Sequence, residues 1–307
     1  WGHRREHVRL LQEEGQNRAY LPGFHFPALL HPEASIKDAV AGAGVIVMVV
    51  PSHAYRQVFS QVSERAQQGA IFVTATKGIE NKSLKTMTQV MGDCCNEDDN
   101  SPPLFAVLSG PSFAKEVAKK VPTAITIGCK HDDTAEFLQN LFSTDYFRVY
   151  TSSDIIGLEV SAAFKNIIAI AAGICDGLAF GSNTRAAVIT RGLAEMTRLG
   201  VRLGAQQETF FGLSGLGDLV LTCTGELSRN RYVGIELGRG RSLGAILDSM
   251  NMVAEGIKTT KSVYDLVTSL EADMPILEQV YEVLYEGKDC GAAVQDLLSR
   301  DLKAESS

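Results

Sequence analysis

The chain has 307 residues, of which 45% are hydrophobic and 21% are charged. At about 150 residues per domain, this length suggests two domains, and the composition is that of a globular protein with a large core. The formal net charge is -7 and the isoelectric point is about 5.5, so we expect no basic face for a nucleic acid. A mildly acidic protein can still bind an anion where it places a few cations locally.

The sequence carries no pattern for export, for a membrane span or for a metal. Its longest apolar runs, residues 45–50 and 167–174, are far shorter than the roughly 20 residues that a membrane-spanning helix needs. No Cys-x-x-Cys pair occurs, and His3-x-x-Glu6-His7 has no evident downstream carboxylate to complete a zinc site. We therefore expect a cytoplasmic protein whose six cysteines are reduced thiols.

The first half of the chain alternates strand and helix patterns. Residues 45–50 form a continuous apolar run rich in valine, as in a strand buried on both faces. Similar strand patterns and intervening amphipathic stretches follow in order: strands at 70–75, 104–108, 123–128 and 147–150, and helices at 53–68 and 132–142. This alternation predicts an α/β fold with a doubly wound, Rossmann-like and mostly parallel sheet.

The second half changes character after about residue 151. Strand patterns stop, and helical patterns punctuated by glycines continue to the end. We therefore predict a dinucleotide-binding domain over residues 1–150 and an all-helical substrate domain over residues 151–307.

The first residues do not look like the start of such a domain. A dinucleotide-binding domain opens with a strand, a glycine-rich loop, a helix and a second strand, over about 30 residues. Residues 1–5 (WGHRR) look instead like the end of the second strand, and we interpret this as an amino-terminal truncation. Residues 212–217 do not replace the loop, because their glycines have the wrong order. At such a strand end, His3, Arg4 and Arg5 favour the 2′-phosphate of NADP, although a solvated basic turn explains them equally well.

Lys165 is the sharpest single indication of chemistry. It lies in residues 160–173, a helix that is apolar on almost every side and should therefore be buried. A lysine is rarely buried unless it is paired, and burial lowers its pKa, which suits a proton donor to a carbonyl. A lysine that extends from the helix edge to solvent is the alternative. The neighbouring Asn166 could orient a substrate oxygen.

Asp218 and Thr222 lie four residues apart and share one face if the segment is helical. Asp218 could pair with Lys165 or hold substrate hydroxyls, but a helix-capping aspartate is an equally good reading.

The segment Ser228-Arg229-Asn230 has the composition of an anion site. Ser228 is a good N-cap for a helix over residues 229–237, and free backbone N–H groups in a first turn attract anions. Arginine also binds phosphate through two parallel hydrogen bonds. The alternative is an ordinary capped helix with a solvated arginine.

Polar or glycine-containing turns follow three of the predicted strands, at residues 50–53, 76–78 and 109–112. Ligands of open α/β sheets bind outside the carboxyl ends of the strands. Each turn alone is ordinary, but three along one sheet edge favour a ligand site there.

Taken in order, these segments resemble bacterial-type NAD(P)-dependent glycerol-3-phosphate dehydrogenases. The matching segments are 49–53 (VVPSH), 75–80 (ATKGIE), 109–116 (SGPSFAKE), 165–170 (KNIIAI), 190–196 (TRGLAEM), 215–219 (GLGDL), 228–230 (SRN) and 253–256 (VAEG). Each motif alone is weak, but all of them in order are highly specific. The resemblance implies reduction of dihydroxyacetone phosphate to sn-glycerol 3-phosphate for phospholipid synthesis, with Lys165 as the catalytic proton donor and acceptor.

The resemblance also implies binding residues. The implied substrate contacts are Lys77, Gly110, Ser112, Asp218, Ser228, Arg229 and Asn230, to which we add Lys165, Asn166 and Thr222 from the sequence. The implied cofactor contacts are His3, Lys77, Ala114, Arg229, Val253 and Glu255, with Tyr20 as an addition. The cofactor is NADP or NAD, with NADPH slightly favoured, and a homodimer is left open.

Two other functions fit the same sequence less well. A β-hydroxyacid or 6-phosphogluconate-type dehydrogenase shares the sheet-plus-helices plan and a lysine on the equivalent helix. A non-catalytic binding or scaffold fragment is the reading that a missing phosphate loop would allow. Rates on each substrate and a titration with NADPH separate these readings.

Overall fold

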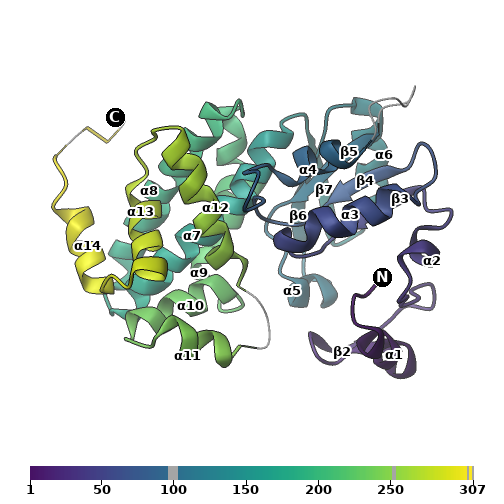
Figure 1. The fold of residues 1–307 in the computed structure, drawn as a ribbon, viewed down its shortest axis with the longest axis horizontal. Coiled ribbons are helices and arrows are strands. Elements are labelled where there is room, and N and C mark those ends of the chain that lie inside the picture. The colour runs from purple at the N-terminus through teal and green to yellow at the C-terminus, as the bar shows by residue number, and fades with distance from the viewer. Residues whose placement is uncertain (96–102, 251–253, 303, 306–307) are drawn as a thin grey trace. The chain divides into compact units, whose positions relative to one another are not determined.

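The computed structural model describes residues 1–95, 103–250, 254–302 and 304–305 (Figure 1). Its contacts divide the chain into two compact units. The first comprises Trp1–Thr76, Thr88–Leu108 and Ser112–Ser153, and the second comprises Lys77–Met87, Ser109–Pro111 and Asp154–Ser307. Two short segments of the first half, which contain Lys77 and Gly110, therefore pack with the helical second half.

The first unit is built on a five-stranded sheet with its strands in chain order. The strands are β3 (Val45–Met48), β4 (Ile71–Thr74), β5 (Leu104–Ser109), β6 (Thr123–Cys129) and β7 (Phe147–Ser152). The pairs β3–β4, β4–β5 and β6–β7 are parallel, with Val45 opposite Ile71 and Thr123 opposite Phe147. All five predicted strands are confirmed, with bounds within two residues, because their apolar runs fill both faces of the sheet.

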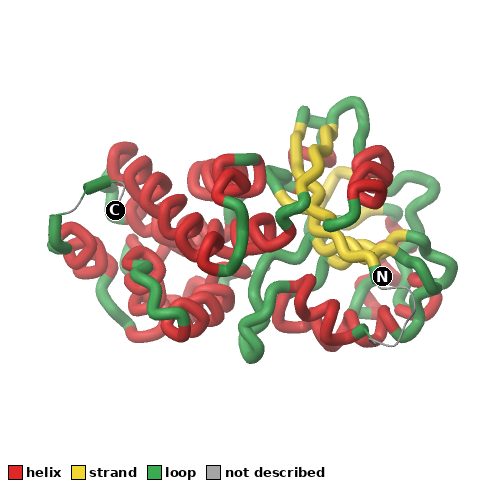
Figure 2. The backbone as a smooth tube through the Cα atoms, turned by 90° about the horizontal axis from the view of Figure 1, so that it is seen from above, coloured by secondary structure: helices red, strands yellow, loops and turns green. Residues whose placement is uncertain are grey.

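Helices lie on both faces of this sheet (Figure 2). The helical elements between β2 and β7 are α2 (Ile36–Val40), η1 (Ser52–Ala54), α3 (Tyr55–Ser63), α4 (Met87–Cys94), α5 (Ala114–Ala118) and α6 (Asp132–Phe142). The predicted helix over 132–142 is confirmed. The helix predicted over 53–68 begins with a 3₁₀ turn and ends at Ser63, because residues 67–70 turn back through Gly69, which has a positive φ of 79°.

The first residues form a helix where the sequence suggested the end of a strand. Helix α1 (Arg5–Glu14) is followed by a hairpin of β1 (Gln16–Asn17) and β2 (Leu21–His25). Arg4 is the extended N-cap of α1, so the strand interpretation of residues 1–5 is wrong. The helix is amphipathic, with Val8 buried and Arg9 paired with Glu13 one turn later, and this helical spacing explains the outcome.

The second unit is helical, as predicted. Its elements are α7 (Ile155–Gly177), α8 (Gly181–Arg202), η2 (Gln207–Phe211), η3 (Leu213–Gly217), α9 (Asp218–Thr224), α10 (Arg229–Gly238), α11 (Leu243–Asp248), α12 (Glu255–Ser269), α13 (Pro275–Tyr281), η4 (Glu282–Glu286) and α14 (Cys290–Leu298). The elements η3 and η4 are π-helical turns.

Helix α7 forms the centre of this unit and contacts α8, α9, α10, α12 and α13. It is the one described helix that is long and apolar enough to cross a membrane, but 94% of its apolar window is buried within the protein. Glycines let α10 approach it closely, since a β-carbon on Gly234 would lie 2.1 Å from the carbonyl oxygen of Ile170. The burial of α7 therefore follows from small residues on both helices.

Candidate active site

Lys165 lies on α7 at the centre of a buried polar cluster. Its side chain is only 4% exposed. The ammonium nitrogen Nζ donates to Asp218 Oδ1 at 2.5 Å and to Thr222 Oγ1 at 2.8 Å. These bonds use two of its three N–H groups, and within the described residues the third remains for another acceptor. The predicted burial and pairing of Lys165 are confirmed.

Asp218 and Thr222 present one face of α9 to Lys165, as their spacing predicted. Thr222 Oγ1 also lies 2.6 Å from the carbonyl oxygen of Asp218, to which it can donate. This local bond fixes the hydroxyl so that its oxygen accepts from Lys165. Asp218 is thus the first residue of α9 and a buried ion-pair partner, whereas Gly217 occupies the N-cap position.

A second lysine reaches the other oxygen of the same carboxylate. Lys77 Nζ donates to Asp218 Oδ2 at 3.0 Å, and its side chain is 28% exposed. Lys77 follows β4 by three residues, so the turn after that strand brings it to Asp218. Local sequence patterns gave no signal for this pair, because the residues are 141 positions apart.

Burial and the neighbouring charges shift the pKa values of Lys165 and Asp218. Burial and the neighbouring Lys77 lower the pKa of Lys165 to about 7, against a partial opposing effect of Asp218. Burial alone would raise the pKa of Asp218, but Lys77 and Lys165 together hold it below its usual value. At neutral pH the carboxylate is therefore ionised, and Lys165 can both give and take a proton.

Two asparagines, Asn166 and Asn230, connect α7 to α10 and α12. Asn230 donates through Nδ2 to Asn166 Oδ1 at 2.9 Å, and its own Oδ1 accepts from the backbone N–H of Gly256 at 2.9 Å. Both side chains are buried, with exposures of 5% for Asn166 and 8% for Asn230. The first turn of α10 is therefore fastened to α7 at Asn166, the residue next to Lys165.

The remaining predicted residues of the second unit surround that network. Ser228 caps α10 by accepting from the N–H of Arg231, as predicted, and Arg229 is exposed in the first turn. Glu255 is half-buried at the start of α12, next to the Gly256 N–H. Gly110 is buried with a positive φ of 137°, a conformation that favours glycine. Val253 lies outside the described residues.

The other predicted cofactor contacts belong to the first unit. His3 is exposed ahead of α1, and the neighbouring Arg4 donates to the hydroxyl of Tyr20 at 2.7 Å. Ala114 begins α5 and is exposed, and Ser112 precedes it and is half-buried. The hairpin thus brings Tyr20 to the basic residues at the start of α1.

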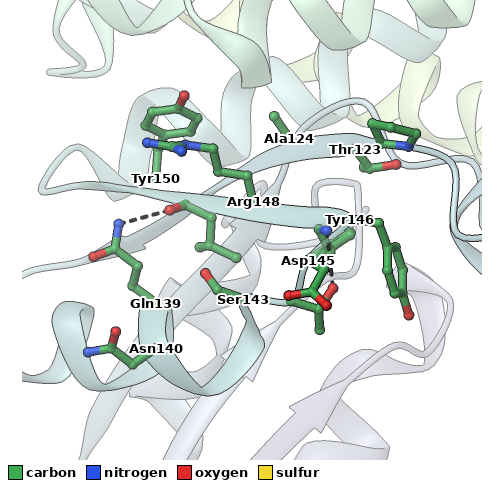
Figure 3. Close-up of a pocket in the computed structure, with 13 residues that line it drawn as sticks. Thr123, Ala124, Gln139, Asn140, Ser143, Asp145, Tyr146, Arg148 and Tyr150 are labelled. Atoms are coloured by element: carbon green, nitrogen blue, oxygen red, sulfur yellow. Dashed lines mark hydrogen bonds between the residues drawn. The ribbon is translucent and has the colours of Figure 1, made fainter.

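A cavity of about 600 Å³ in the first unit holds none of these residues. It is lined by 13 residues of β6, β7, α6 and the turns beside them. In Figure 3, Gln139 donates to the carbonyl oxygen of Val149 at 2.8 Å, and Arg148 lies over the ring of Tyr150. The two charged residues that line the cavity, Asp145 and Arg148, are exposed, so the cavity presents no buried charge that would support chemistry.

Metal and thiol chemistry find no support in the described part of the chain. No group of three or more histidine, cysteine or acidic side chains that could hold a metal occurs there. All six cysteines are free. Burial raises the pKa of the Cys223 thiol, next to Thr222, to about 12, so it is not a nucleophile at neutral pH.

Two family models match the chain. The NAD-dependent glycerol-3-phosphate dehydrogenase N-terminus matches residues 1–135, and the C-terminus of the same family matches residues 154–295. The chain belongs to the glycerol-3-phosphate dehydrogenase family. The resemblance drawn from the motifs is thereby confirmed, and with it a Rossmann-like domain followed by a helical one in an NAD(P)-dependent oxidoreductase family.

Individual relatives agree with this assignment. A glycerol-3-phosphate dehydrogenase (NAD(P)+) from Desulfotalea psychrophila is 57% identical over 309 residues, which cover 99% of this chain and 90% of the relative. The crystal structure of a glycerol-3-phosphate dehydrogenase from Coxiella burnetii has a TM-score of 0.93 at 39% identity, covering 98% of this chain and 90% of that one. A Dunaliella salina structure, at 22% identity and a TM-score of 0.86, covers 95% of this chain and 52% of that one and shows the fold alone. The predicted truncation of the dinucleotide-binding element stays a prediction.

Proposed function

We propose that this member of the glycerol-3-phosphate dehydrogenase family reduces dihydroxyacetone phosphate to sn-glycerol 3-phosphate with NADPH or NADH, for phospholipid synthesis. The observation that carries the proposal is the buried Lys165–Asp218–Lys77 cluster, in which one carboxylate holds two lysines. A ketone reduction needs an acid with a pKa near the working pH, and Lys165 at about 7 meets that need.

Lys165 is the proton donor in this mechanism. Asp218 and Thr222 hold its nitrogen in one place, and its third N–H points the proton at the carbonyl oxygen of C2. As negative charge develops on that oxygen, the ammonium stabilises it and then transfers the proton. Lys77, the more exposed lysine, contributes a second positive charge to the substrate. In the reverse direction neutral Lys165 takes the proton from the alcohol.

The phosphate end of the substrate fits the start of α10. Arg229 is exposed in the first turn, and the N-terminus of the ten-residue helix offers backbone N–H groups with a favourable dipole. Ser228, Gly110 and Ser112 supply further short polar or backbone contacts. Because Asn166 and Asn230 already bond to each other, we expect their contribution to be mainly the placing of this turn relative to Lys165.

The cofactor chemistry is a hydride supplied by the nicotinamide when NAD(P)H is bound. The exposed cations at the start of α1 suit its adenosine end, since Arg4 is held by Tyr20 next to His3 and Arg5. Guanidinium groups accommodate the 2′-phosphate, which favours NADPH. Ala114, Glu255, Lys77, Arg229 and Val253 are the other proposed cofactor contacts. Residues 1–150 then form the cofactor domain and residues 151–307 the substrate domain, except that the short segments with Lys77 and Gly110 pack with the substrate domain.

Substrate and cofactor competition tests this function. The purified protein should oxidise NADPH rapidly with dihydroxyacetone phosphate and much more slowly with β-ketoacids, and in the reverse direction it should prefer sn-glycerol 3-phosphate to 6-phosphogluconate. Equal or faster rates on the acids would favour a β-hydroxyacid-type dehydrogenase. NADPH binding without turnover on any of them would favour a non-catalytic protein. Size-exclusion chromatography in the same preparation tests for a homodimer, and fractionation of the source cells tests the cytoplasmic location.

A further inference from the structure

Two buried serine hydroxyls lie one helical turn from the catalytic pair and have no partner. Ser161 on α7 is 0% exposed and Ser214 on η3 is 1% exposed. Neither hydroxyl makes a hydrogen bond to any described residue. A hydroxyl that is buried without a partner costs free energy, and protein interiors usually satisfy such groups with an internal water.

The contacts at either end place the two serines opposite each other. Gly157 of α7 lies against Thr209, whose Cγ2 is 2.9 Å from a β-carbon built on that glycine, and Lys165 bonds to Asp218. The segments 157–165 and 209–218 run in the same direction between these two contacts. Ser161 is four residues from Gly157 and from Lys165, and Ser214 is five residues from Thr209 and four from Asp218. The two hydroxyls therefore occupy matching levels of two segments that pack together.

The same spacing directs the lysine toward them. A long side chain on a helix leans toward the helix N-terminus and covers the residue four positions earlier. We therefore expect the side chain of Lys165 to extend toward Ser161, and Asp218 lies one turn after Ser214. The segment that carries Ser214 is a π-helical turn, a rare element that often occurs at functional sites.

We propose that Ser161 and Ser214 bind one internal water beside the Lys165–Asp218 ion pair, and that this water helps to keep Lys165 protonated. The two hydroxyls do not bond to each other, and a water with two polar partners satisfies both. A water dipole next to a buried ammonium replaces part of its lost hydration. Ser161 and Ser214 are then positioning residues for the proposed reduction. The effect on the pH dependence of the rate rests on that proposed function, whereas the presence of the water does not.

The other charged groups on or against α7 also have protein partners: Asp154 accepts from the N–H of Gly157 and the hydroxyl of Thr209, and the buried Glu159 interacts within the protein. Lys165 is faced by Asp218 and the neutral Cys223 of α9, by Thr222 and by Lys77. Further along, Arg231 of α10 bonds to Asp176, and Glu195 of α8 bonds to the N–H groups at the start of α13. Among the buried side-chain groups without a partner, Ser161 and Ser214 are the two that lie one turn before Lys165 and Asp218 in the sequence.

A high-resolution crystal structure of the unliganded protein tests the water directly and independently of activity. The expected result is a water peak at about 2.5–3.0 Å from both Ser161 Oγ and Ser214 Oγ. The contrary result is a pair of rotated hydroxyls that donate to carbonyl oxygens of their own helices with no water between them.

The pH dependence of reduction tests the effect on Lys165. In the double variant with Ser161→Ala and Ser214→Ala, the limb of the pH profile in which kcat/KM falls with rising pH should move to lower pH. Each single variant should already show most of that shift, because loss of either hydroxyl weakens the binding of the water. Thr260→Val is the matched control, since the buried Thr260 hydroxyl bonds within its own helix to Gly256, and its limb should stay in place. Should the double variant not fold, the single variants give the answer. An unmoved limb in the serine variants would overturn the proposal.

Discussion

Replacing Asp218 with asparagine removes the one carboxylate that bonds to both lysines of the cluster while keeping the shape of the side chain. Wild-type reduction requires protonated Lys165, so its kcat/KM should fall as pH rises through about 7, where the pKa of Lys165 lies. Oxidation requires the neutral amine and should rise over the same range. In Asp218→Asn the repulsion from Lys77 remains and the attraction is lost, so the pKa of Lys165 must fall further.

The size of this change follows from the contact. An opposite charge at hydrogen-bonding distance changes the pKa of a buried group by about 1–3 units, so the loss of the Asp218 carboxylate should lower the pKa of Lys165 by at least about one unit. At pH 7 the protonated fraction then drops from about one half to about one tenth or less. Because neutral Lys165 is tolerated in the core, the protein should remain folded, unlike one left with an unpaired buried charge.

The assay is the pH profile of kcat/KM for the reduction of dihydroxyacetone phosphate, with thermal unfolding measured on the same samples. Asp176→Asn is the matched control, since Asp176 is a mostly buried carboxylate of α7 that binds Arg185 and Arg231 away from Lys165. The Asp176→Asn control should be less stable than the wild type, but its kcat/KM should fall over the same pH range as that of the wild type. A limb that stays in place or moves to higher pH in Asp218→Asn would show that Asp218 does not raise the pKa of Lys165.

Two further changes probe the scaffold around the site. Burial raises the pKa of Glu195 from 4.5 to about 7, so the folded state holds its proton more tightly, and this stabilising effect is present below about pH 4.5 and lost as pH rises to 7. Relative to Glu195→Gln, the wild-type free energy of unfolding in urea should therefore fall by up to about 3 kcal/mol over that range, and parallel curves would contradict this. Gly234→Ala should destabilise the fold by about 1–3 kcal/mol or more, because its β-carbon meets the backbone of α7. Gly244→Ala, in open space on α11, should be neutral or stabilising in the same melts, and equal losses in both variants would reject the packing argument.

Structural features that are fixed within one short stretch of the chain could be predicted from the sequence. The strands of the sheet follow from apolar runs, and the burial of Lys165 follows from the apolar residues around it on α7. The pairing of Asp218 with Thr222 follows from helical spacing. These features hold because the same short stretch of sequence fixes both the element and the face that it buries.

Other features depend on contacts that no single stretch contains. Lys77 reaches Asp218 across 141 positions, and Asn230 joins Asn166 across 64. The strand expected at residues 1–5 failed for a related reason, since its assignment relied on an assumed domain plan while residues 5–14 have a helical pattern of their own. The turns after β4 and β5 pack with the helical unit, so a division of the chain near residue 150 misses part of the site.

In the proposed mechanism Lys165 delivers the proton to the substrate. The most direct test of this step is single-turnover reduction of dihydroxyacetone phosphate by Lys165→Met, which keeps the length and apolar packing of the side chain. The rate of the chemical step should fall by about 10²–10⁴-fold, with binding of NADPH unchanged. A rate within a few-fold of wild type would contradict this role of Lys165.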